Sequence, residues 1–144
     1  MVIRKFLKQN ILFTVILCIA AILGAMYLFD YRRAESYDIE VLEITPERPV
    51  ADGQTPVEIT VKLTKRGKEI EGHSLYMVPK NGGNVEYNRC LTDENGEAKF
   101  IYYPYKATVL MPAKTVEIRV YDESNSIFVV VNTCYDFPIE LVKE

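Results

Sequence analysis

Nineteen consecutive uncharged residues, 11–29, dominate the N-terminal part of the chain. In a lipid bilayer every backbone N–H and C=O group needs a partner within the protein, and a helix supplies those partners by itself. A helix of this length rises about 28 Å, close to the ~30 Å thickness of the hydrocarbon core. We therefore predict a transmembrane helix over residues 11–29, which commits the chain to a membrane.

Two other uses of an apolar N-terminal run fit the sequence less well. The apolar region of a cleaved signal peptide has about 7–15 residues and ends in a small-x-small site. This run is longer, and Leu23 stands two positions before Ala25. A lipoprotein needs a small residue before its cysteine, whereas Leu17 precedes Cys18. An uncleaved single-span anchor is therefore the preferred interpretation.

The charges around this run predict its orientation and the division of the chain. Three cationic residues precede the run and two follow it, and cationic residues favour the cytoplasmic side. They are Arg4, Lys5 and Lys8 before the run, and Arg32 and Arg33 after it. We expect a cytoplasmic tail over residues 1–10, a stalk over 30–37 and an extracytoplasmic domain over 38–144, in the cell membrane of a prokaryote.

The expected extracytoplasmic domain is acidic. Of the 17 Lys and Arg residues and 20 Asp and Glu residues in the chain, residues 38–144 hold 12 and 18, which gives a net charge of −6. Such a domain has no electrostatic reason to bind nucleic acid or an anionic lipid surface. The predicted partners are the lipid bilayer and a membrane protein, or a second copy of the chain through the helix.

Residues 38–144 carry the alternation of β-strands. Within residues 57–65 apolar and polar side chains strictly alternate, so one face of the strand is buried. The expected strands are residues 38–44, 57–65, 73–78, 84–90, 98–103, 115–122 and 127–131. The run 127–131 is apolar on both faces, as a covered strand would be. Seven strands separated by turns predict an all-β, immunoglobulin-like antiparallel sandwich.

Several segments resemble the bacterial immunoglobulin-like domain of the invasin and intimin type. The resemblance covers roughly residues 40–131, and `TDENGEAKF` is its most distinctive part. The other matching parts are `ADGQTPVEITVKL`, Gly67, Ile70-Glu71-Gly72, Leu75 and `TVEIRVYD`, in the family's order. The resemblance implies the fold. It implies little about adhesion, because this chain has one module and a helical anchor in place of a tandem array and an outer-membrane barrel.

The segment Asp93-Glu94-Asn95-Gly96 raises the question of a metal site. A helix-loop-helix calcium site places oxygen ligands at alternate positions over twelve residues. The segment is shorter than that and lies between strands. We expect the turn of a β-hairpin, with Gly96 at positive φ, and neither a metal nor another cofactor.

The sequence contains no recognisable catalytic arrangement. His73 is the single histidine, and we expect it exposed at a strand end. Ser74 follows it directly, so the two side chains point to opposite faces of a strand and cannot act as nucleophile and base. Gly82-Gly83 lies between strands and does not precede a helix, as a phosphate loop would. We predict that the chain is not an enzyme and takes no small-molecule substrate.

One candidate interaction surface lies within the predicted membrane span. Small residues allow helix backbones to approach closely in lipid, where no hydrophobic force drives association. The candidate helix-association face consists of Thr14, Cys18, Ala21, Gly24 and Ala25. The alternative is the ordinary alanine content of an anchor that faces lipid.

A second candidate surface is the connection Pro104 to Lys114. Because it follows the fifth strand, alternating strand directions place it at the end of the sandwich far from the membrane. The candidate partner-binding residues are Tyr103, Tyr105, Val109, Leu110 and Met111. Exposed apolar residues at a loop tip suit a protein interface. The alternative is that they close the end of the sandwich core.

The same strand directions separate the two cysteines outside the helix. Cys90 ends the fourth strand near the membrane, whereas Cys134 follows the seventh at the far end, so we expect no disulfide between them. The tail that begins at Cys134 is a candidate edge strand.

These features predict a non-catalytic accessory or structural subunit of a cell-envelope membrane complex, which binds its partner through the helix and the sandwich. The alternative is a surface adhesin-like or glycan-binding module. That alternative would need an aromatic platform, for which Tyr102, Tyr103 and Tyr105 are the candidates.

Overall fold

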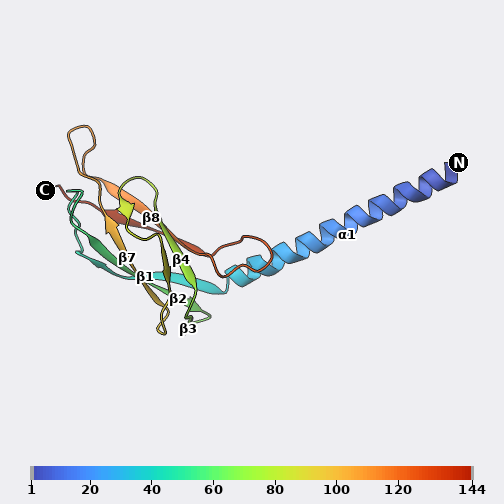
Figure 1. The fold of residues 1–144 in the computed structure, drawn as a ribbon, viewed down its shortest axis with the longest axis horizontal. Helices are drawn as coiled ribbons and strands as arrows, with labels where there is room; N and C mark the ends of the chain where they lie inside the picture. The colour runs from blue at the N-terminus through green and yellow to red at the C-terminus, as the bar shows by residue number, and fades with distance from the viewer. Residues whose placement is uncertain (1, 144) are drawn as a thin grey trace.

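The computed structural model describes residues 2–143, and the side chains of residues 10–143. One helix, α1 (Val2–Ala34), leads into a β-sandwich that begins three residues later (Figure 1). The uncharged run is thus the middle of a longer helix, which includes residues 30–34 of the expected stalk. Residues 10–34 are long and apolar enough to cross a membrane, and their most apolar part is not buried against the sandwich.

The sandwich consists of two antiparallel sheets. The first has the strand order β1-β2-β7-β5, with β3 paired to β2, and the second has the order β6-β4-β8-β9. The strands are β1 (Tyr37–Thr45), β2 (Val57–Lys65), β3 (Lys68–Glu69), β4 (Ser74–Pro79), β5 (Asn84–Val85), β6 (Arg89–Leu91), β7 (Glu97–Tyr103), β8 (Thr115–Asp122) and β9 (Cys134–Glu140). The predicted all-β sandwich behind a helix is confirmed.

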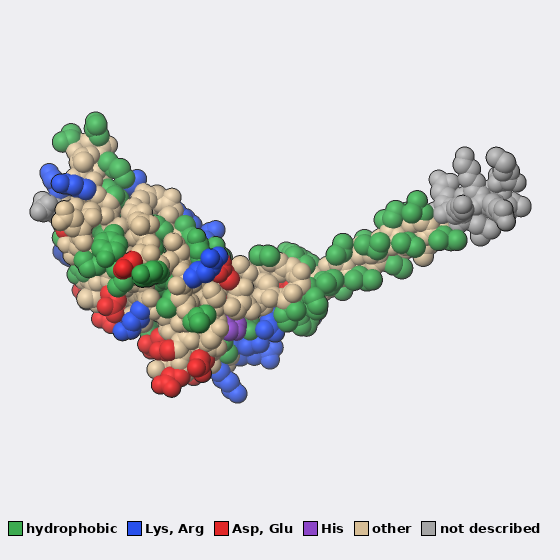
Figure 2. All heavy atoms as spheres, in the orientation of Figure 1, with side chains coloured by type: hydrophobic (Ala, Val, Ile, Leu, Met, Phe, Trp, Pro, Cys, Tyr) green, Lys and Arg blue, Asp and Glu red, His purple; other side chains and the backbone are tan. Residues whose placement is uncertain are grey.

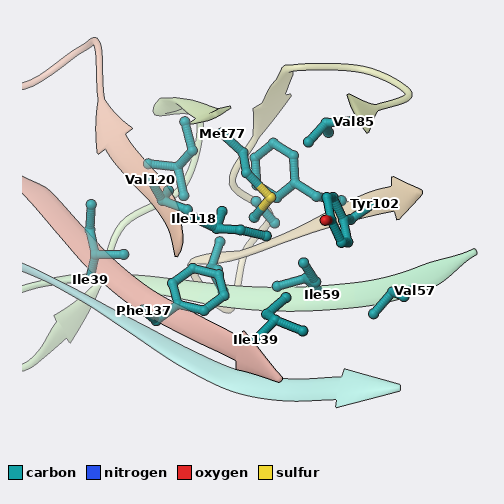
Figure 3. Close-up of a cluster of buried hydrophobic side chains, with 14 of the residues drawn as sticks. Ile39, Val57, Ile59, Met77, Val85, Tyr102, Ile118, Val120, Phe137 and Ile139 are labelled. Carbon is teal, nitrogen blue, oxygen red and sulfur yellow. The ribbon is translucent and has the colours of Figure 1, made fainter. Parts of the chain in front are cut away.

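The core lies between the two sheets and follows from the alternation of the strands (Figure 3). The inward-facing side chains of β2 and β8 are almost completely buried. They are Val57, Ile59, Val61 and Leu63 on β2, and Val116, Ile118 and Val120 on β8. Full burial of such a side chain contributes about 1.5–3 kcal/mol relative to leaving it exposed. Phe100 and Tyr102 of β7 are buried in the same core.

The prediction of a strand over residues 127–131 was wrong. These residues form a loop, because the backbone N–H groups of residues 127–129 donate to the carboxylate of Asp30 instead of a neighbouring strand. The strand at this edge of the sheet is β9, whose Phe137 and Ile139 are buried. Pro138 has no backbone N–H to donate. This is tolerated in β9 because β9 is an edge strand. The candidate edge strand in the tail is confirmed.

The chain changes sheets twice between residues 84 and 97, which the sequence did not reveal. The expected strand 84–90 divides into β5, which pairs with β7, and β6, which pairs with β4. The turn after β6 therefore connects two sheets and is not the turn of a hairpin. Its predicted geometry is nevertheless present: Gly96 has φ +73° and its N–H donates to the Asp93 carbonyl at 2.9 Å.

Gly96 gives a testable consequence of this close turn. A Cβ at residue 96 would lie 2.5 Å from the carbonyl oxygen of Leu63, which belongs to the backbone of β2 and cannot move aside. Gly67 has almost the same φ, +77°, but open space around it. We expect Gly67→Ala to cost only the strain of positive φ, about 1–2 kcal/mol. Gly96→Ala should cost about 1–3 kcal/mol more because of the collision.

Urea unfolding of the two variants in mild detergent measures this difference in free energy. Equal losses of stability in Gly96→Ala and Gly67→Ala would contradict the close packing of the turn on β2.

Asp136 fastens β9 to its sheet and predicts an acid-dependent contribution to stability. Arg119 donates to both carboxylate oxygens at 2.7 and 2.8 Å, and Lys80 donates at 2.6 Å. The hydrogen bonds from Arg119, then Lys80, hold the pKa of Asp136 well below its ordinary value of 3.8. A lowered pKa stabilises the fold above the unfolded-state pKa, and this contribution is lost as the pH falls through the folded-state value.

Asp136→Asn should therefore be less stable than the natural protein by a constant amount above about pH 5, and the difference should shrink progressively below about pH 4. Thermal unfolding of both proteins across this range measures the difference. A gap that is independent of pH would exclude the charged form of Asp136 as its source.

The position expected for Cys134 was also wrong. Cys134 opens β9 opposite Tyr121, at the end of the sandwich near α1, where Cys90 also lies. β4 and β8 stand between β6 and β9, so three inter-strand spacings, about 14 Å, separate the two cysteines. Both thiols are free, as expected, but the separation is across the sheet and not along it.

Candidate interaction surfaces

The helix meets the sandwich through a buried carboxylate. Asp30 lies one residue beyond the uncharged run, and its side chain is completely enclosed. It accepts hydrogen bonds from the backbone N–H groups of Ile127 at 3.0 Å, Phe128 at 2.7 Å and Val129 at 2.5 Å. A carboxylate at the end of an apolar run is therefore fully paired by a loop from the far end of the sequence.

Further hydrogen bonds join the end of the helix, and the residues directly after it, to connections of both sheets. Arg33 Nε donates to the Asn125 carbonyl at 2.7 Å, and the Thr133 hydroxyl donates to the Ala34 carbonyl at 2.7 Å. On the other side, the N–H of Arg66 donates to the Ser36 carbonyl at 3.0 Å. These contacts make the junction between α1 and the sandwich a structured interface. One feature of the sequence marks this interface: the acidic residue Asp30 directly follows the apolar run.

The candidate helix-association face lies along the free part of α1. All five of its residues, Thr14, Cys18, Ala21, Gly24 and Ala25, are exposed. Apart from its chain neighbours and the nearby backbone of its own helix, no atom lies within 4 Å of the position of a Cβ on Gly24. The Thr14 hydroxyl donates to the Asn10 carbonyl at 2.8 Å, within its own helix. The face is thus open to another helix, and association through it stays a prediction.

The candidate partner-binding loop projects from the end of the sandwich opposite α1 (Figure 1). Val109 is 100% exposed and Leu110 97%, so neither side chain closes the core. Tyr105, Ala107 and Ala113 pack against the core in that position. Hydrophobic side chains gather at this tip in Figure 2.

The three tyrosines near this loop do not form an aromatic platform. Tyr102 is completely buried, and its hydroxyl donates to the Gly82 carbonyl at 3.0 Å. The Tyr105 hydroxyl donates to the Pro112 carbonyl at 2.8 Å and accepts the N–H of Lys114 at 3.1 Å, so this side chain shapes the base of the loop. Only Tyr103, which is half-buried, is left for a ligand-stacking role.

His73 is not the exposed strand-end residue expected from the sequence. Its Nδ1 lies 2.7 Å from a carboxylate oxygen of Asp122, whose side chain is completely buried, and its ring lies 5.3 Å from that of Tyr37. The Ser74 hydroxyl instead faces Glu123, at 3.4 Å. The His73–Asp122 pair therefore joins the start of β4 to the end of β8. The Ser74 hydroxyl is not directed toward it. Among the described residues, no three His, Cys, Asp or Glu side chains are grouped to hold a metal ion.

Among solved structures, the sandwich is similar to immunoglobulin-like adhesin domains. The D00-D0 domains of intimin align with a TM-score of 0.54 and 13% identity, over 73% of this chain and 48% of that one. The adhesin InvE of Yersinia pseudotuberculosis aligns with a TM-score of 0.51 and 13% identity, over 73% of this chain and 32% of that one. The chain thus spans about half of the intimin fragment's length and a third of InvE's.

A conjugative transposon lipoprotein from Bacteroides eggerthii aligns with a TM-score of 0.47 and 18% identity, over 72% of this chain and 96% of that one. No protein-family model matches the sequence, and no curated protein is detectably similar to it.

The domain therefore has an immunoglobulin-like β-sandwich fold, as the sequence predicted. At these identities the likeness concerns the fold. The helix of residues 10–34, which is long and apolar enough to cross a membrane, is what indicates a membrane or envelope protein.

Proposed function

We propose that this chain is a non-catalytic, membrane-anchored subunit, accessory or structural, of a cell-envelope complex. One observation carries the proposal: the sandwich is fastened to α1 at one end and presents an exposed apolar tip at the other. A fixed junction holds that tip at a set distance from the membrane that contains α1. Such an arrangement suits a neighbouring membrane protein better than a distant ligand.

The proposal includes an uncleaved anchor with its N-terminus in the cytoplasm. The three cationic residues before the apolar run and two after it favour this orientation. The contacts of Asp30 and Arg33 with the sandwich support retention of the helix, because cleavage before them would remove the helix that they fasten.

The partner would be recognised in two places. Val109 and Leu110 supply apolar contact at the tip, and the small residues Ala21 and Gly24 allow a second helix to pack closely in the bilayer. The surface adhesin-like module is the second candidate, since the same exposed tip would serve a ligand outside the membrane.

The test is purification of the tagged full-length protein from its native membranes in mild detergent, followed by mass spectrometry. A stoichiometric membrane partner is expected. The double variant Val109→Asp/Leu110→Asp should lose it, and so should Ala21→Leu/Gly24→Leu. Tyr87→Ser is the matched control, because Tyr87 is 74% exposed but lies outside both surfaces.

Recovery of the natural protein alone, or only with itself, would refute the subunit role and direct attention to soluble ligands of the tip. Loss of a partner in the tip variant but not in the helix variant would assign recognition to the sandwich.

A further inference from the structure

An apolar loop borders the helix where it enters the sandwich. We name residues 126–131 the junction loop; its four central residues are Ile127, Phe128, Val129 and Val130. Ile127 is 56% exposed, Phe128 54% and Val130 84%. Apolar side chains that are exposed side by side mark a surface covered by something other than water. Neither of the two surfaces discussed above includes this loop.

Most N–H groups of the junction loop are hydrogen-bonded within the protein. Asp30 accepts the N–H groups of residues 127–129. The Ser126 hydroxyl and the Asn125 amide donate to the Val131 carbonyl at 2.8 and 3.0 Å, and the Val131 N–H donates back to Ser126 at 3.0 Å. Irregular backbone is excluded from lipid because its donors and acceptors are unpaired. Here the N–H groups of residues 127–129 and 131 already have partners, and the side chains of Ile127, Phe128 and Val130 are exposed.

The loop also lies at the depth of the predicted membrane boundary. The ring of Phe128 packs edge-on against that of Phe29, with centroids 5.7 Å apart. Phe29 is the last residue of the uncharged run, so whatever medium surrounds the end of that run also surrounds Phe128. Figure 1 shows the loop folded back along the end of α1, and Figure 2 shows hydrophobic side chains gathered where the sandwich meets the helix.

We propose that the junction loop enters the interfacial layer of the bilayer that α1 spans. It is a second membrane contact, and together with α1 it sets the tilt of the sandwich. A helix alone fixes one axis and leaves the protein free to rotate about it. A membrane contact beside that axis also fixes the rotation. This inference rests on the proposed membrane anchor, and its test separates the two.

The absence of tryptophan from the chain makes the test direct. Four full-length variants, each with one tryptophan, are reconstituted in vesicles with and without brominated acyl chains, which quench indole fluorescence on contact. Phe128→Trp reports on the junction loop, Leu17→Trp on the middle of α1 and Leu110→Trp on the distal tip. Val130→Trp is a second reporter of the loop.

We expect Phe128→Trp and Val130→Trp to be quenched and shifted to shorter emission wavelengths, as Leu17→Trp is, while Leu110→Trp is unaffected. Quenching of Leu17→Trp without quenching at residues 128 and 130 would overturn the loop proposal and retain the anchor. An unquenched Leu17→Trp would overturn both.

A different observation, at the same end of α1, carries a second inference. A groove of about 600 Å³ has an apolar wall from the helix and a cationic rim from both α1 and the end of β2. It is lined by Ala25, Leu28, Phe29, Arg32, Arg33, Ser36, Lys65 and Arg66. No carboxylate lies within ion-pair distance of its four cationic side chains among residues 10–143. The net charge of −6 for residues 38–144 conceals this local cationic cluster, which is why net charge alone predicted no contact with anionic lipid.

We infer that the groove binds an anionic phospholipid of the same bilayer. An acyl chain would lie along Leu28 and Phe29, and the phosphate would accept hydrogen bonds from the guanidinium groups, which match its geometry. Neighbouring Lys65 and Arg66 would attract the remaining negative charge of the headgroup.

The test compares the phosphatidylglycerol that remains bound when the full-length protein is purified from vesicles of equal phosphatidylglycerol and phosphatidylcholine. Arg32→Gln/Lys65→Gln/Arg66→Gln should lose the preference for phosphatidylglycerol, at about fivefold per charge removed. Arg48→Gln/Lys106→Gln/Lys114→Gln removes the same number of charges away from the groove and should keep the preference for phosphatidylglycerol. Equal preference in both triple variants would overturn the inference.

Discussion

Replacing Asp30 with alanine is expected to release the junction loop from α1 while the sandwich stays folded. Three backbone N–H groups would lose a charged acceptor, and hydrogen bonds to charged groups are the stronger class. Hydrogen exchange at residues 127–129 should accelerate by about ten- to a hundredfold. Exchange in β2 and β8 should be unchanged, because their hydrogen bonds lie within the sheets.

Two further variants make this result specific. Asp30→Asn keeps an acceptor oxygen without the charge and should give intermediate exchange rates. Asp38→Ala removes an exposed carboxylate from β1 and should have no effect on the loop. Unchanged exchange at residues 127–129 in Asp30→Ala would show that other contacts hold the loop, and the rigid junction would lose its main support.

The same junction shows why the candidate site was only partly predictable from sequence. The distal loop followed from counting strands, because alternating directions place the fifth connection away from α1. The junction depends on contacts between Asp30 and residues 97 to 99 positions later. No local sequence pattern encodes such a pairing. Neither Asp30 nor the apolar run 127–131 therefore indicates the other as its partner.

The fold itself was predictable where one face of a strand is buried. β2 and β8 begin and end at the residues that the alternation indicated, since each alternate side chain enters the core. The run 127–131 failed because apolarity alone does not distinguish a buried strand from a loop whose side chains face outward. β9 was underestimated because Pro138 argues against a strand unless that strand lies at an edge.

Loss of Asp122 should destabilise the sandwich as a whole. Its buried carboxylate faces His73 Nδ1 at 2.7 Å and accepts the N–H of Ser124 at 2.8 Å. Asp122→Ala leaves His73 Nδ1 and the Ser124 N–H without this partner. Both lie close to the start of the connection between β8 and β9, which contains the junction loop. Leaving a buried donor without its acceptor costs about 1–3 kcal/mol.

Glu123 is the matched control, one position further along the chain. Its carboxylate pairs with Arg89 at the surface, so Glu123→Ala should cost less than about 1 kcal/mol. Urea unfolding of both variants in mild detergent measures this contrast, and hydrogen exchange adds a second readout. If Asp122 also stabilises the junction loop, Asp122→Ala must accelerate hydrogen exchange at residues 127–129. A loss of global stability without that acceleration would confine Asp122 to the joining of β4 and β8, and would leave Asp30 as the one carboxylate on which the loop depends.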